Sequence, residues 1–141
     1  MAQPYNLERF INAQDHQYPQ ALAEVQRGRK TSHWMWYIFP QVKGLGASDM
    51  AHHYGIRNID EAAAYLHHPV LGKRLVEISS ALLSLQAMNI EAVLGHTDSL
   101  KLRSCMTLFS LVEGADDVFE RVLLHYFNGR KDDKTIGLLG M

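Results

Sequence analysis

Residues 69–85, PVLGKRLVEISSALLSL, contain the clearest helical pattern in this chain of 141 residues. Their apolar residues recur at steps of four and three, as along one side of an α-helix: Leu71, Leu75, Ile78, Leu82 and Leu85. Pro69 suits a first helical turn, where its missing N–H costs no hydrogen bond. We therefore predict the longest helix of the chain here, with its leucine side buried in a core.

Helix signals also precede this stretch. Asn6 suits the cap of a short first helix, and Pro19 suits the first turn of a second helix that ends at Gly28. Ser32 can cap a third, compact segment that stops at Pro40. The N-terminal part of the chain is thus predicted to form three separate helical segments.

Similar signals follow along the chain. Capping residues predict further helix starts at Ser48, at Asn58 or Asp60, at Asp98 and at Asp116. Alternating runs of β-branched residues are nearly absent, so we predict an all-α fold, a compact single-domain multi-helix bundle of irregular topology over residues 1–141. Its common core should contain Leu75, Ile78, Leu82, Leu102, Phe109, Phe119, Val122 and Leu123.

Composition narrows the class of protein. The formal net charge is −1, which gives no strong signal for nucleic acid or for an anionic membrane. No apolar run is long enough for a bilayer span, and the first residues do not resemble a secretory signal. A single cysteine, Cys105, excludes an intrachain disulfide. We expect a cytoplasmic protein, without a cofactor motif such as a Walker loop.

The least ordinary segment, residues 28–41, reads GRKTSHWMWYIFPQ and holds both tryptophans. It lies within residues 25–48, which contain no Asp or Glu. A helix start beside cations attracts an anion, and an aromatic ring can stack a planar group. The sequence therefore predicts one anion-accepting cleft, with these ligand-binding residues: Arg29, Lys30, Ser32, His33 and Trp36. Trp34, on the opposite side of the helix from Trp36, is assigned to the core.

The sequence signals for metal binding and for catalysis are weaker. The histidine pairs at 52–53 and 67–68 do not have the spacing of a metal site on a helix, so no metal is expected. Lys101 and Ser104 lie about one turn apart, a spacing that supports nucleophilic chemistry when the amine is desolvated. That spacing is common on helices, and it leaves enzymatic activity open. Cys105 is interpreted as a small buried residue.

Residues 31–41, TSHWMWYIFPQ, followed by GLG at 44–46 and by Ser48, resemble the signature of the domain-of-unknown-function family 1810. Further agreement lies within residues 6–14, 64–75 and 98–109. The resemblance implies a compact, mostly helical bacterial protein and brings no established activity. Some members carry a calpastatin-like label, which the dense apolar pattern of this chain does not support. Cys105 departs from the family, in which a small polar residue is expected.

Three interpretations of the Trp-rich segment remain. It can form a cleft for a phosphorylated or nucleotide-like small molecule, or it can present the same basic and aromatic surface to a protein partner. It can also be core alone. A deep pocket would favour the first, whereas a flat apolar patch would favour the second.

Overall fold

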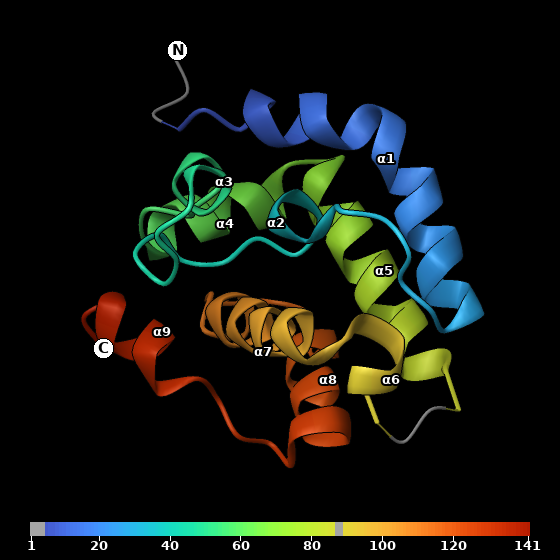
Figure 1. Cartoon of the computed structure of the whole chain (residues 1–141). Coiled ribbons are helices and arrows are strands. Elements are labelled where there is room, and N and C mark those ends of the chain that lie inside the picture. The colour runs from blue at the N-terminus through green and yellow to red at the C-terminus, as the bar shows by residue number, and fades with distance from the viewer. Residues whose placement is uncertain (1–4, 87–88) are drawn as a thin grey trace.

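The computed structural model describes residues 5–86 and 89–141. Within these residues the chain forms helices joined by short loops, and the only β feature is an isolated bridge between Val42 and Ile56 (Figure 1). The helices are α1 Glu8–Arg27, α2 Met35–Ile38, α3 Asp49–His53, α4 Ile59–His67, α5 Leu71–Ser84, α6 Glu91–Leu94, α7 His96–Ser110, α8 Val118–Phe127 and α9 Asp133–Leu138. The predicted all-α class is confirmed.

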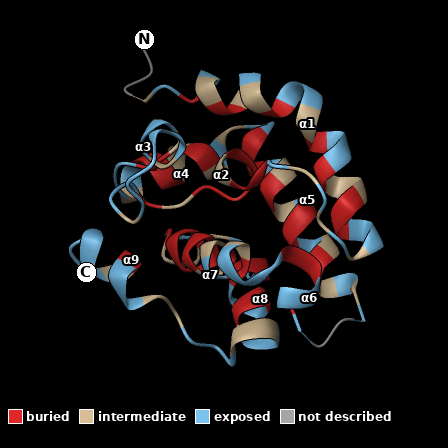
Figure 2. Cartoon of the chain, in the orientation of Figure 1, coloured by how far each residue is buried: buried red, intermediate tan, exposed pale blue. Residues whose placement is uncertain are grey.

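The core is built around α7, which contacts α4, α6, α8 and α9. Six consecutive residues of this helix, 104–109, are buried, so α7 is covered on all sides in its second half. Buried segments of α4, α5, α7 and α8 face one another (Figure 2). All eight side chains predicted for the common core are buried.

Helix α5 follows the predicted pattern with a different start. Its apolar side is buried through Leu82, and the helix begins at Leu71 rather than at Pro69. The imidazole Nδ1 of His68 accepts the N–H groups of Val70 and Leu71, at 3.1 and 3.3 Å, and so satisfies donors at the helix start. Gly72 brings α5 against α4, because a Cβ there would lie 2.0 Å from the carbonyl oxygen of Leu66.

The prediction of two helices before Gly28 was wrong. Residues 8–27 form one helix of 20 residues, α1, which is longer than α5 and contains Pro19 in its interior. Pro19 and Asp15, whose carbonyl loses its partner, are both exposed, so water can satisfy the oxygen. The helix bends along its length instead of ending (Figure 1).

Two of the predicted caps are confirmed. The Ser48 hydroxyl accepts the Ala51 N–H at 3.1 Å, and the Asn58 side chain accepts the Glu61 N–H at 2.8 Å. Ser32, by contrast, does not cap α2, whose N-cap residue is Trp34.

In the described ranges, no helix combines the length and apolar character needed to cross a membrane.

Candidate functional site

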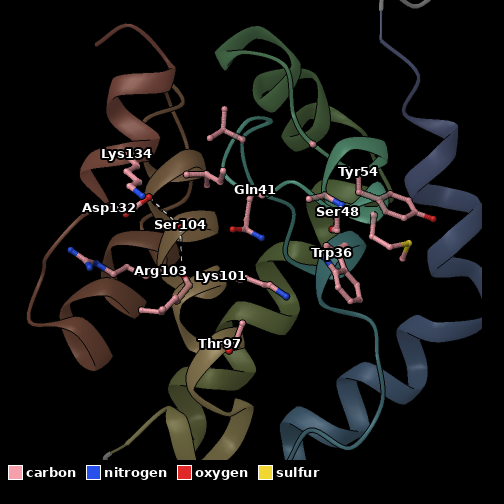
Figure 3. A pocket seen from close by; sticks show the side chains of 17 residues that line it. Trp36, Gln41, Ser48, Tyr54, Thr97, Lys101, Arg103, Ser104, Asp132 and Lys134 are labelled. Atoms are coloured by element: carbon pink, nitrogen blue, oxygen red, sulfur yellow. Dashed lines mark hydrogen bonds between the residues drawn. The ribbon is translucent and has the colours of Figure 1, made fainter.

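A cleft of about 500 Å³ opens between α2, the loop that follows it, α3, α7 and the start of α9 (Figure 3). Its polar lining includes Gln41, Ser48, Thr97, Lys101, Arg103, Ser104, Asp132 and Lys134. Its apolar and aromatic lining includes Trp36, Val42, Leu45, Met50, Tyr54 and Leu100. The size is ordinary for a small-molecule site, and the mixture of an apolar wall with a few polar groups is typical of such sites.

One wall is held by backbone hydrogen bonds between two loops. The Ile56 N–H donates to the Gln41 carbonyl and the Lys43 N–H donates to the Ile56 carbonyl, each at 2.8 Å. Gly55 permits this approach, because a Cβ there would lie 2.7 Å from the Cβ of Lys43. Arg9 supports the same wall from α1, donating to the carbonyl oxygens of His53 at 2.8 Å and Gly55 at 2.9 Å.

The most distinctive contact in the cleft joins α7 to α2. The Lys101 ammonium lies 4.5 Å from the centroid of the Trp36 ring, within the range of a cation–π interaction. Its counter-ion is Asp98, whose Oδ1 lies 3.3 Å from Lys101 Nζ. The other oxygen, Oδ2, lies 2.9 Å from Lys30 Nζ. One carboxylate is therefore shared by two lysines, and this group of three side chains keeps a net charge of +1.

The end of the cleft near α9 is also cationic, but part of it is occupied by structural contacts. Arg103 donates to the backbone carbonyls of Arg130 and Lys131, both at 2.8 Å, and thereby fixes the segment before α9. Asp132 caps α9 by accepting the backbone N–H of Thr135 at 3.1 Å. Lys134 is exposed, and within the described residues its ammonium has no ion-pair partner.

Ser104 does not pair with Lys101. Its hydroxyl oxygen lies 3.2 Å from both the Leu100 carbonyl oxygen and Asp132 Oδ2, so its proton is engaged there. Lys101 instead donates to Asp98. The geometry therefore does not activate Ser104 as a nucleophile.

The structure distributes the sequence-predicted site residues over three places. Trp36 lines the cleft. Lys30 reaches it through Asp98 and also lies over the Trp34 ring, 5.0 Å from the centroid. Arg29, Ser32 and His33 do not line the cleft; Arg29 and His33 are exposed on the loop between α1 and α2.

Ser32 belongs to a second polar centre around Glu24 of α1, which is only 1% exposed. The Ser32 hydroxyl donates to Oε2 at 2.7 Å, and the Thr31 and Ser32 N–H groups donate to Oε1 at 2.7 and 2.9 Å. The indole Nε1–H of Trp34 donates to Oε1 at 3.0 Å, and Gln20 donates to Oε2 at 3.1 Å. These bonds satisfy the carboxylate inside the protein and explain why Ser32 is not available as a helix cap.

Electrostatics agrees with this geometry. Burial by itself raises the pKa of Glu24, but the hydrogen bonds from Ser32, the Thr31 amide and Trp34 outweigh it and lower the pKa from 4.5 to about 2. The Cys105 thiol is buried, and burial raises its pKa well above the ordinary value. It is therefore an inert packing group, as the sequence predicts.

Sequence reasoning missed Gln41 and Thr97 as cleft residues and Lys101 as the cation beside Trp36. Gln41 ends the aromatic segment, so the absence of acids over residues 25–48 was a signal that applied to it. Thr97 and Lys101 lie on α7, about 60 residues along the chain, and no local pattern connects them with Trp36.

Among the described residues, no group of three or more His, Cys, Asp and Glu side chains is arranged to hold a metal ion.

Comparison with known proteins places the chain in a family. A conserved hypothetical protein, Rv1873 from Mycobacterium tuberculosis, has a crystal structure that matches with a TM-score of 0.95 and 42% sequence identity, covering 99% of each chain. No curated protein matches the sequence. The family described as "Protein of unknown function (DUF1810)" matches residues 4–139. The chain therefore belongs to the DUF1810 family.

Proposed function

We propose that this protein binds a phosphorylated or nucleotide-like small molecule in the cleft between α2, α3, α7 and α9. The observation that carries the proposal is the Lys101 ammonium at 4.5 Å from the Trp36 ring centroid in a cleft of about 500 Å³. A lysine held beside an aromatic wall provides both a charge for an anion and a surface for a planar group. The proposal concerns binding and assigns no reaction.

The charges of the lining support an anionic ligand. Lys101, Arg103 and Lys134 line the cleft, against one acid, Asp132. Asp98 reduces the charge of Lys101 only in part, because Lys30 shares the same carboxylate. Two other hollows among the described residues lack this bias, since each is lined by cations and acids in similar numbers.

Two residues of the sequence-derived set keep a role in this proposal. Trp36 forms the wall, and Lys30 holds Asp98 so that the carboxylate does not neutralise Lys101 completely. Lys30 suits this task because its side chain is only 9% exposed and is fixed between Asp98 and the Trp34 ring.

The proposal is tested by isothermal titration calorimetry with pyrophosphate, ribose 5-phosphate and adenosine 5′-monophosphate. We expect at least one of them to bind, and we expect Lys101→Met to weaken that binding by about tenfold or more, because a charge-assisted contact is lost. Lys73→Met is the matched control, since Lys73 is an exposed lysine on α5 outside the cleft. Equal affinity in the wild type and Lys101→Met, or no binding by any of the three, would contradict the proposal.

A second candidate function is a protein-interaction surface on the same face. Two apolar residues at the cleft, Met50 and Leu100, are 38% and 50% exposed, which favours contact with a partner. This alternative predicts that Leu100→Ser abolishes capture of a protein partner while the phosphorylated probes show no binding.

We place this binding in the bacterial cytoplasm. The similar protein of known structure comes from Mycobacterium tuberculosis, and the one cysteine is a buried free thiol, as suits a reducing compartment.

A further inference from the structure

The side chain of Gln41 is a polar group without a hydrogen-bond partner among the residues that the structure describes. Its backbone is fixed, because its carbonyl accepts the Ile56 N–H at 2.8 Å and the preceding Pro40 is buried. Its amide points into the cleft (Figure 3), and within the described part of the chain it makes no side-chain hydrogen bond. A rigid backbone thus presents an unpaired donor and an unpaired acceptor to the space that a ligand would fill.

A carboxamide offers an N–H donor and a C=O acceptor side by side. This pair matches the edge of a planar heterocycle that carries an acceptor next to a donor. In adenine, a ring nitrogen accepts and the exocyclic amine donates; in guanine, O6 accepts and N1–H donates. Cytosine and uracil present the same kind of pair, whereas a sugar phosphate has no such flat edge, so the Gln41 amide favours a ligand with a nucleobase.

The other cleft residues suit the rest of such a molecule. Lys101 and Thr97 project into the same space as Gln41, and they provide a cation and a hydroxyl for a phosphate (Figure 3). Leu45 and Met50 line the cleft as well and offer apolar contacts to the faces of a flat ring.

We infer that the ligand of this cleft is a nucleotide, whose base edge pairs with the Gln41 amide and whose phosphate lies at Lys101. This inference rests on the proposed function and goes beyond it, because it names the ligand class and the residue that selects it. Gln41 is a specificity-determining residue, whereas Lys101 recognises the anion whatever is attached to it.

The first experiment compares adenosine 5′-monophosphate with ribose 5-phosphate by calorimetry. In the wild type the base should strengthen binding by about tenfold, as a good bidentate contact does. In Gln41→Leu that advantage should fall to about twofold or less, while the affinity for ribose 5-phosphate stays unchanged. Gln26→Leu is the matched control, since Gln26 is exposed on α1 and does not line the cleft.

The second experiment exchanges the amide for a carboxylate. In Gln41→Glu the side chain only accepts hydrogen bonds, which suits the N1–H and N2–H donors of guanine and opposes the ring nitrogen of adenine. The ratio of affinities for guanosine and adenosine 5′-monophosphates should therefore shift about tenfold toward guanosine relative to the wild type, even though the added charge weakens both.

The outcomes separate the two proposals. Binding of ribose 5-phosphate that depends on Lys101, with no gain from the base or no change of the ratio in Gln41→Glu, overturns the inference about the base alone. Loss of ribose 5-phosphate binding in Gln41→Leu also overturns it, because Gln41 would then support the cleft rather than read a base. Absence of binding by every probe overturns both.

Discussion

The two tryptophans of this chain lie two residues apart and belong to polar centres of opposite kinds. Trp34 is fully buried and donates to Glu24, whose carboxylate receives all of its hydrogen bonds from nearby side chains and amides. Trp36 is half-buried and lies beneath the Lys101 ammonium at an open cleft. Lys30 connects the two centres, because it covers the Trp34 ring and holds Asp98.

The contrast separates structural polar groups from groups that are available to a ligand. A buried carboxylate with internal donors is a structural element, and it stabilises the loop that wraps around it. Groups with remaining donors and acceptors beside a cavity, such as Gln41 and Lys101, are those that a ligand can satisfy. Composition alone does not distinguish the two centres, since both combine indole rings with charge.

The largest expected effect on stability lies at the buried centre around Glu24. Glu24→Ala leaves the Thr31 and Ser32 amides and the Trp34 N–H without an acceptor, so the free energy of unfolding should fall by about 3–5 kcal/mol. Chemical denaturation measures the loss. A change below about 1 kcal/mol would mean that the centre is not structural.

The pH dependence of stability should report on the same carboxylate, Glu24. The pKa of Glu24 is lowered to about 2 in the folded chain, so between pH 4.5 and 2 the unfolded state binds the proton first. The contribution of Glu24 to the free energy of unfolding is therefore complete above about pH 4.5 and is lost as the pH falls toward 2. It amounts to about 3 kcal/mol. Glu24→Gln should remove this part of the pH dependence, whereas the core variant Leu82→Ala, less stable by about 2–5 kcal/mol, should retain it.

Matched substitutions of the two tryptophans test the contrast directly. Trp34→Phe removes a buried hydrogen bond and leaves unfilled volume, so it should cost about 2 kcal/mol of stability and leave ligand affinity unchanged. Trp36→Phe should cost less than about 1 kcal/mol and weaken binding of the phosphorylated probes, because the cleft loses part of its wall. Equal stability losses in the two variants would contradict the distinction between a structural centre around Glu24 and a ligand-accessible centre at Trp36.

The smallest effect is expected at Asp98, which pairs with both Lys30 and Lys101. Asp98→Asn removes the negative charge next to Lys101, so the affinity for a phosphorylated probe should rise by about fivefold, the equivalent of about 1 kcal/mol. Calorimetry at constant ionic strength measures this gain. Weaker binding in this variant would show that Asp98 positions Lys101 rather than competing with the ligand for it.

Local patterns predicted the parts of the fold that depend on local forces. The spacing of Leu75, Ile78 and Leu82 located the buried side of α5, and Ser48 and Asn58 cap helices as expected. The start of the second helix at Pro19 was wrong, because tertiary packing maintains α1 through a proline whose lost hydrogen bond faces solvent.

The candidate site could be predicted only in part, because it forms between distant segments. The aromatic segment pointed to Trp36, which lines the cleft, and to Lys30, which reaches the cleft only through Asp98. Whether Ser32 would face a ligand or Glu24 depended on how α1 lies beside the following loop, which no pattern within residues 28–41 encodes. Lys101 comes from a helix that meets α2 only in the folded chain.

The placement of the indoles also gives the protein an intrinsic optical reporter. A ligand that draws the Lys101 ammonium away from the Trp36 ring changes the field on that fluorophore, and its emission should shift. Trp34 is shielded from solvent and bonded to Glu24, so it contributes a constant background. Occupancy of the cleft can thus be followed in unlabelled protein by its own fluorescence.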